Sequence, residues 1–104
     1  MKLSKVTLTR EVEWRLQAAG ITCWSEMYLI GSRAGGRIHS ESDYDVAVVV
    51  PPRFRTPMYQ SRLDQMLEEE YMEDGEEYKR SNQVDIFLVG PRGIQMPYIE
   101  WPHL

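Results

Sequence analysis

The chain has 104 residues, of which 42% are hydrophobic and 27% are charged, and its formal net charge is −4. This length and composition predict one compact domain over residues 1–104. No apolar stretch approaches the roughly 20 residues needed to cross a bilayer, and the polar start lacks the apolar segment of a secretory signal. The negative charge disfavours nucleic acid as a partner, because phosphate backbones attract clustered Lys and Arg.

Cysteine and histidine usage narrows the chemistry further. Cys23 is the single cysteine, so no intramolecular disulfide can form, and a reducing, cytoplasmic compartment is expected. We expect Cys23 to be a small, partly buried side chain. His39 and His103 are the only histidines, too few with one cysteine for a structural zinc site.

The first predicted element is a helix over residues 9–19. Thr9 can act as its N-cap, Glu11 and Glu13 would lie in the first turn, and Gly20 can close the C-terminus. The apolar residues that share one face of this helix are Val12, Leu16 and Ala19.

Three strands and a second helix follow. We predict strands over residues 26–30, 44–50 and 83–89, the second of them stopped by Pro51 and Pro52. Pro57 can open a helix at its first position. The apolar stripe of that helix would consist of Tyr59, Leu63, Met66, Leu67 and Tyr71. Because a helix connects the last two strands, a parallel arrangement of these strands is expected.

The order helix–strand–strand–helix–strand predicts an α/β (α+β) fold, with a small mixed β-sheet and flanking helices. The tail, residues 91–104, contains prolines that prevent a long helix, yet it is apolar, so it should pack on the domain or on a partner. Residues 68–77 carry seven acids in ten positions, which is typical of a solvated helix end and could otherwise contact a basic partner.

Carboxylates gather around the second and third strands. Asp43 and Asp45 open the second strand with one residue between them, so their side chains should share a face of the sheet, opposite Tyr44. Asp85 lies inside the apolar third strand. Carboxylate oxygens suit Mg²⁺, and two such ions can clamp both oxygens of a displacement at phosphorus.

A small-residue turn precedes these carboxylates. Gly31 and Ser32 end the first strand, where Gly31 allows close approach of the backbone to phosphates and Ser32 adds a hydroxyl donor. If a helix begins near Ala34, its N-terminus would favour anions as well. The pattern therefore indicates a site for a nucleoside triphosphate and divalent cations.

Each feature also has an ordinary explanation. An Asp-x-Asp pair is most often a solvated strand end, and a Gly-Ser pair is most often a plain turn. Asp85 could be a single residue on the wet face of an edge strand. Arg33, Arg37, Arg53 and Arg55 could face a triphosphate, although solvation at the surface is the commoner state for each. The combination of features at this spacing favours the site.

This combination resembles the nucleotidyltransferase superfamily that includes DNA polymerase beta, and in particular its minimal nucleotidyltransferases. Their signature is Gly-Ser, ten residues, then Asp-x-Asp. The positions that match the fuller family pattern are Gly31, Ser32, Ala34, Gly36, Ser42, Asp43, Asp45 and Val46. Where such proteins often carry a basic residue before the last glycine, this chain has Gly35, with Arg33 and Arg37 nearby.

The resemblance implies a polymerase-beta-palm-like fold and a set of site residues. Asp43 and Asp45 would bind two Mg²⁺ ions, or Mn²⁺ in their place, and Asp85 would bind the catalytic ion and help to deprotonate an acceptor hydroxyl. The residues implied to hold ATP or another nucleoside triphosphate are Gly31, Ser32, Arg33, Gly36 and Ser42.

The resemblance also implies a biological role. Minimal members are frequently antitoxins paired with a helical HEPN-type toxin, and some are thought to transfer AMP to a tyrosine of that partner. A non-catalytic, protein-binding antitoxin with a vestigial nucleotide site is one alternative. Transfer to a small molecule such as an aminoglycoside is another, for which a homo-oligomer could build the acceptor pocket.

Overall fold

The computed structural model describes residues 5–31, 34, 44–73, 84–94 and 98–101, with the backbone alone for 67–73. In chain order they form α1 (Lys5–Ala18), β1 (Glu26–Ile30), β2 (Tyr44–Val49), the short 3-10 helix η2 (Pro52–Phe54), α2 (Pro57–Glu73), β3 (Val84–Val89) and β4 (Tyr98–Glu100). Neither of the two described α-helices is long and apolar enough to span a membrane.

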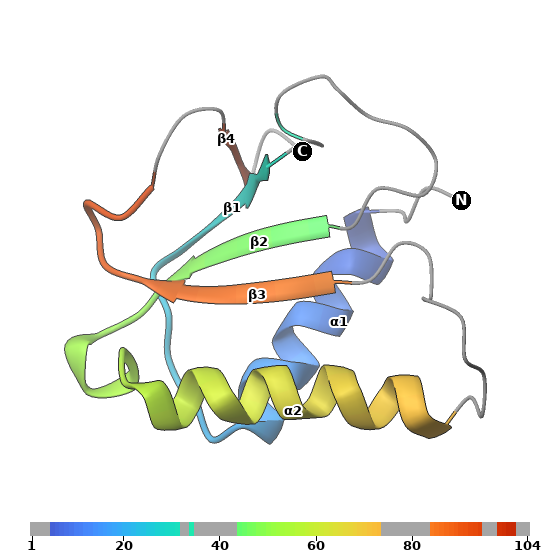
Figure 1. The fold of residues 1–104 in the computed structure, drawn as a ribbon. Coiled ribbons are helices and arrows are strands. Elements are labelled where there is room, and N and C mark those ends of the chain that lie inside the picture. Colours follow the sequence, from blue (N-terminus) through green and yellow to red (C-terminus); the bar gives the residue numbers. More distant parts are fainter. Residues whose placement is uncertain (1–4, 32–33, 35–43, 74–83, 95–97, 102–104) are drawn as a thin grey trace.

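The strands form one mixed sheet in the order β3-β2-β1-β4 (Figure 1). β1 pairs antiparallel with both β2 and β4. β2 and β3 pair in parallel, with α2 in the connection between them. The predicted mixed α/β fold and the parallel pair are therefore confirmed.

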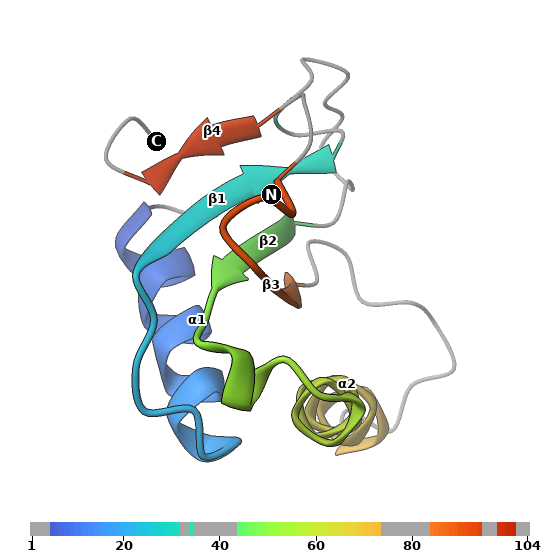
Figure 2. The same cartoon turned by 90° about the vertical axis from the view of Figure 1, so that its left-hand side faces the viewer.

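Both helices pack on one side of the sheet (Figure 2). Alternate strand residues face them, because successive side chains of a strand point to opposite faces. The main core is therefore built from one helix-facing set on each strand and one apolar stripe on each helix. Its buried members include Leu8, Val12, Leu16, Met27, Leu29, Tyr44, Val46, Val48, Leu63, Val84 and Ile86.

The other side of the sheet, here called the open face, carries the alternate strand residues. A small second cluster of Tyr28, Ala47 and Val49, with Ile30, Val89 and Ile94 packed against it, covers its middle. Phe87 and Tyr98 keep 42% and 40% of their surface exposed. Among the described residues, both helices pack on the opposite side of the sheet.

The first helix begins earlier than predicted. α1 starts at Lys5, and the Thr9 hydroxyl donates a hydrogen bond to the Lys5 carbonyl oxygen at 2.7 Å. The expectations that Thr9 is the N-cap and that Glu11 and Glu13 lie in the first turn are therefore wrong. The predicted end is confirmed, because Gly20 has a φ of +88° and its N–H bonds the carbonyl of Gln17 at 3.0 Å.

The remaining predicted elements lie close to their observed bounds. β1 matches its prediction, β2 ends one residue early at Val49, and α2 begins at Pro57 as expected. Leu63 of the predicted stripe is buried, with Tyr59 and Met66 packed against the core. Residue 83 and the side chains of Leu67 and Tyr71 lie outside what the structure describes, as do the side chains of the acidic run.

The tail contains a strand that the sequence analysis did not predict. β4 pairs with β1, and Ile99 and Trp101 pack against the core. The Trp101 indole N–H donates to the Thr9 hydroxyl oxygen at 2.9 Å, which joins the tail to α1. In its described part, the tail therefore packs on its own domain.

Cys23 is exposed, so the expectation of partial burial is wrong. It follows the turn after α1, where Arg53 donates a hydrogen bond to its sulfur at 3.3 Å. Cys23 lies in the connection between the buried residues Ile21 and Met27, where the neighbouring Trp24 packs against the core and Cys23 does not.

A side chain of α2 hydrogen-bonds backbone groups on the outer edge of β3. Gln60 donates from its amide nitrogen to the Ile86 carbonyl at 2.7 Å, and its amide oxygen accepts from the Leu88 N–H at 3.0 Å. This pair of bonds imitates the contact that another strand would make. Exposed edge groups invite pairing with other chains, so Gln60 both anchors β3 and protects it.

We predict that Gln60→Ala lowers the free energy of unfolding by about 1–3 kcal/mol, because it leaves two backbone groups of β3 without their partner. Urea denaturation measures this difference. Gln17→Ala is the matched control, since Gln17 is exposed on α1, and its effect should be small. Equal effects of the two substitutions would contradict the role given to Gln60.

Candidate active site

Two carboxylates meet on the open face. In the parallel pair, Asp45 of β2 lies directly opposite Asp85 of β3. Both are half-buried, and both belong to the alternate set that points away from the helices. Neighbouring strands are about 4.8 Å apart, so the structure brings together two residues that are far apart in the sequence.

Gly31 completes the described part of the site. It follows β1, whose last residue, Ile30, lies opposite Asp45 on the other side of β2. Gly31 has a φ of +72°, and a Cβ placed on it would come 2.5 Å from Asp45 Oδ2. Glycine is therefore required twice here, for the left-handed backbone and for the room that the carboxylate occupies.

The other predicted site residues lie outside the described residues. These are Ser32, Arg33, Gly36, Ser42 and Asp43. The predicted placement of Tyr44 and Asp45 on opposite faces is confirmed, because Tyr44 is buried toward the helices and Asp45 lies on the other face. Ala34 lies in a turn, with its N–H bonded to the Gly31 carbonyl at 3.1 Å, and any helix that begins there also falls outside the described part.

The ordinary explanation for Asp85 describes its place in the fold correctly. β3 is an edge strand, and Asp85 is on its open face. What that explanation does not account for is the second carboxylate directly opposite. Two neighbouring carboxylates repel each other unless a cation or solvent separates them, and a divalent metal ion is one cation that suits this position.

The donor set fits divalent metal ions of the Mg²⁺ type. Asp45 and Asp85 supply hard oxygen ligands from two rigid strands, and Mg²⁺ is commonly held by one or two carboxylates plus substrate phosphates. Within the described ranges, no group of three or more His, Cys, Asp and Glu side chains has metal-binding geometry. Asp43, the third predicted ligand, is not among the described residues.

Two arginines proposed as phosphate contacts lie at the wrong end of the sheet. Arg53 and Arg55 follow the C-terminal end of β2, whereas Asp45 is near its start. Arg53 stacks on Phe54, and Arg55 lies against Gly90 beyond the end of β3. Both are exposed, so solvation at the surface, the commoner state, describes them.

The fold and this pair of carboxylates define a class of protein: a small mixed-sheet domain that presents acidic ligands from adjacent strands beside a glycine turn. A family model described as "Nucleotidyltransferase domain" matches residues 10–100. The chain therefore belongs to the nucleotidyltransferase domain family, which supports nucleotidyl transfer as its general activity and the resemblance to the polymerase-beta-like superfamily. No curated protein and no solved structure matches the chain.

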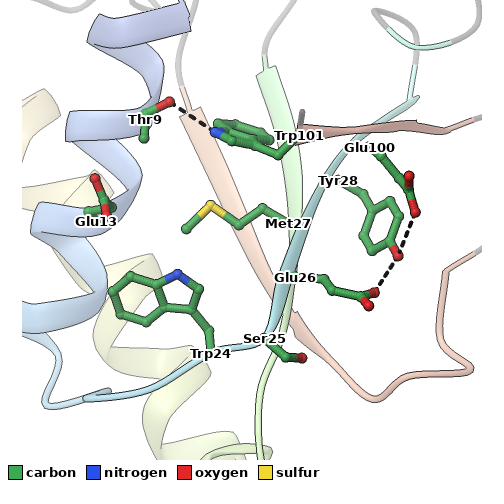
Figure 3. Close-up of a pocket in the computed structure, with 9 residues that line it drawn as sticks. All are labelled: Thr9, Glu13, Trp24, Ser25, Glu26, Met27, Tyr28, Glu100 and Trp101. Atoms are coloured by element: carbon green, nitrogen blue, oxygen red, sulfur yellow. Dashed lines mark hydrogen bonds between the residues drawn. The ribbon is translucent and has the colours of Figure 1, made fainter. Parts of the chain in front are cut away.

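A pocket of about 420 Å³ lies elsewhere on the domain. Figure 3 shows Trp24, Met27 and Trp101 on its α1 side, and Glu26, Tyr28 and Glu100 on the other face of the sheet. Glu26 begins β1 and Glu100 ends β4, whereas Gly31 follows the other end of β1 and Asp45 lies opposite Ile30 at that end. The pocket is therefore separate from the carboxylate pair.

Tyr28 connects two acids on the open face. Its hydroxyl donates to Glu26 and lies 3.4 Å from Glu100 Oε1 (Figure 3). Its ring also packs edge-on against Tyr98, with centroids 5.3 Å apart. The hydrogen bond to Glu26, followed by burial, raises the pKa of Tyr28 from 10.0 to about 12.

We predict that the left-handed backbone alone makes Gly31→Ala and Gly20→Ala each cost about 1–2 kcal/mol of stability. Only the first substitution would displace Asp45, since a Cβ at Gly20 meets the flexible end of Arg62 at 3.3 Å. Divalent-metal binding, measured by calorimetry, should therefore be lost in Gly31→Ala alone. Equal metal binding in both variants would contradict the role given to Gly31 in making room for Asp45.

The raised pKa of Tyr28 predicts a stability change at high pH. Because the folded protein favours the protonated phenol, this contribution is fully present below pH 10 and is lost as pH rises from 10.0 toward about 12. Unfolding measured across this range should show the loss, and Tyr28→Phe should remove it. Glu26→Gln should lower the pKa of Tyr28, so that phenolate absorbance appears at lower pH. An unchanged titration would contradict the hydrogen bond to Glu26 as the main cause of the raised pKa.

Proposed function

We propose that this domain is a metal-dependent nucleotidyltransferase that transfers AMP from ATP to a hydroxyl group on a partner protein, and that it acts as the antitoxin of a toxin–antitoxin pair with a HEPN-type toxin. The observation that carries the enzymatic part is the direct pairing of Asp45 with Asp85 beside the left-handed Gly31. Family membership supports the transfer reaction in general.

In the proposed reaction, the acceptor oxygen forms a bond to the α-phosphorus of ATP. The bond from that phosphorus to the bridging oxygen breaks, and pyrophosphate leaves. The hydroxyl proton passes to the Asp85 carboxylate. Mg²⁺ ions held by Asp43, Asp45 and Asp85 would neutralise phosphate charge and align the attacking and leaving oxygens.

The backbone around Gly31 contributes by its shape. A left-handed glycine without a side chain allows close approach to its own backbone, and turns of this kind can bind anions. Gly31, Ser32, Arg33, Gly36 and Ser42 are the residues proposed to hold the triphosphate. The nucleotide would then lie between this turn and the acidic pair.

The proposal of a protein acceptor draws on the open face. Phe87 follows Asp85 by two residues on the same face, and Tyr98 lies opposite Ile30, the neighbour of Asp45. Their exposed rings border the acidic pair, and aromatic residues are enriched in interface cores. A partner seated there could bring its hydroxyl to the carboxylates.

The decisive test substitutes the acids one at a time. We predict that Asp43→Asn, Asp45→Asn and Asp85→Asn each reduce nucleotide transfer by more than about 100-fold, the upper range for residues that only support metal ligands. Folding should be preserved. Magnesium-dependent ATP binding by calorimetry and labelled transfer to a co-expressed partner are the two measurements.

Glu100→Gln is the control, because it removes an acid from the open face without touching the pair, and its transfer should be unchanged. Retained transfer in the three Asn variants would overturn the site. Tight partner binding that needs neither ATP nor magnesium, with no modification of the partner, would instead establish the binding-only antitoxin. Transfer to an aminoglycoside alone would establish the small-molecule enzyme.

A further inference from the structure

Arg15 is a buried charged residue in a helix that otherwise packs apolar side chains onto the sheet. Only 4% of its surface is exposed. It occupies a position on α1 between Val12 and Leu16, where an apolar residue would be expected. Burying a guanidinium is costly unless its hydrogen-bonding groups find partners. The partners of Arg15 therefore indicate its role in the fold.

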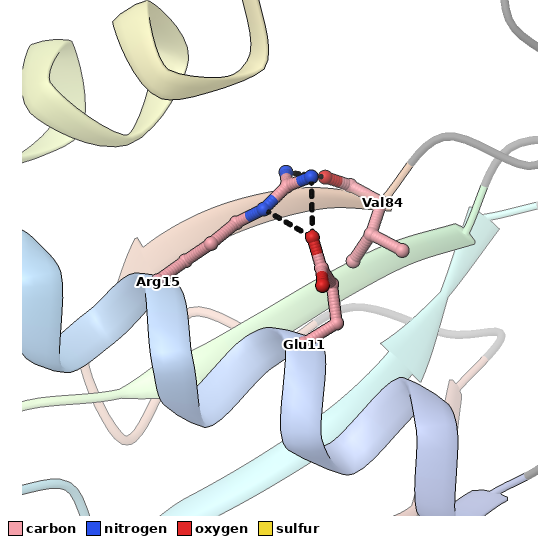
Figure 4. Close-up of polar contacts among 3 residues, drawn as sticks. All are labelled: Glu11, Arg15 and Val84. Atoms are coloured by element: carbon pink, nitrogen blue, oxygen red, sulfur yellow. Dashed lines mark hydrogen bonds and ion pairs between the residues drawn. The ribbon is translucent and has the colours of Figure 1, made fainter. Parts of the chain in front are cut away.

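The described contacts of Arg15 join one helix to one strand (Figure 4). The Nε and Nη2 atoms of Arg15 lie 2.9 Å and 2.8 Å from Glu11 Oε1, one turn earlier on α1. Its Nη1 donates to the Val84 carbonyl oxygen at 2.7 Å. Glu11 thus orients the guanidinium, and the guanidinium hydrogen-bonds the carbonyl of Val84, the first residue of β3.

The Val84 carbonyl, which Arg15 binds, belongs to the peptide unit between Val84 and Asp85. A peptide unit is planar, so holding the Val84 oxygen also fixes the orientation of the Asp85 nitrogen. The backbone of Asp85 continues from this peptide plane, and the Asp85 side chain lies on the open face. β3 begins at Val84, so Asp85 is the second residue of the strand and follows the held carbonyl directly.

We propose that Arg15 is a positioning residue for Asp85: from the helix side of the sheet, it sets the direction in which this carboxylate faces Asp45. The inference rests on the proposed function, because it takes Asp85 as a metal ligand. Arg15 itself touches neither substrate nor metal. Lysine could not replace it, because one ammonium lacks the planar fork that serves Glu11 and Val84 together.

A second anchor on the same strand provides a matched control. Gln60 binds the edge of β3 at Ile86 and Leu88, farther from Asp85. Loss of Gln60 should weaken β3 without turning the Val84–Asp85 peptide. Arg15→Lys and Gln60→Ala therefore both remove edge contacts of one strand, and only the first acts at the acidic pair.

The first measurement is amide hydrogen exchange on the full chain without metal. Arg15→Lys should speed exchange at Asp85 most, whereas Gln60→Ala should speed it at Leu88 most, because that N–H loses its acceptor. Glu11→Gln, which keeps the guanidinium and its bulk, should give a smaller change at Asp85. If Arg15→Lys affects Asp85 no more than Gln60→Ala does, the inference is wrong.

The second measurement is the affinity for Mn²⁺ in the presence of ATP, with urea denaturation to record stability. Arg15→Lys should weaken Mn²⁺ binding by about 10–100-fold, and Gln60→Ala should leave it unchanged despite its lower stability. If affinity falls with stability alike in both variants, Arg15 is only structural and the inference fails. If the wild type binds no Mn²⁺, the proposed function fails, while the exchange result still decides whether Arg15 orients Asp85.

Discussion

The register between β2 and β3 is the constraint on which the site depends. Val46 and Val48 alternate with Asp45 along β2, and Val84 and Ile86 flank Asp85 on β3. The valines and the isoleucine are buried against the helices. Because the side-chain period of a strand is two, burying them forces both aspartates onto the open face. A slip of one residue would bury a carboxylate instead, at a cost of several kcal/mol.

The two sides of the sheet differ in character: both helices and most of the core lie on one side, and the acidic pair lies on the other. Helices α1 and α2 bury the core side, and their polar residues Arg15 and Gln60 hold the outer edge of β3 by side-chain hydrogen bonds. An edge strand can in this way stay rigid without a further strand beside it. The open face carries the exposed rings of Phe87 and Tyr98 and the half-buried carboxylates of Asp45 and Asp85.

Local signals account for what the sequence analysis predicted and for where it was wrong. Strand bounds followed from apolar runs ended by glycine or proline, as at Pro51. The start of α1 was placed at Thr9 because this residue suits an N-cap, but Leu8 is buried in the core, and its burial extends the helix by one turn. β4 is only three residues long in a proline-containing tail, and pairing with β1 defines it.

The sequence by itself determined the family resemblance and the opposite faces of Tyr44 and Asp45, because motif spacing and strand alternation are local properties. The need for glycine at position 31 comes from its left-handed backbone and its closeness to Asp45, which the structure revealed. Tertiary structure alone decided that Asp85 lies opposite Asp45, since their pairing depends on strand order and on the crossover through α2. It also placed Arg15 against the carbonyl of Val84, a residue far along the chain. Contacts between distant residues are set by how the whole core packs, which no local pattern encodes.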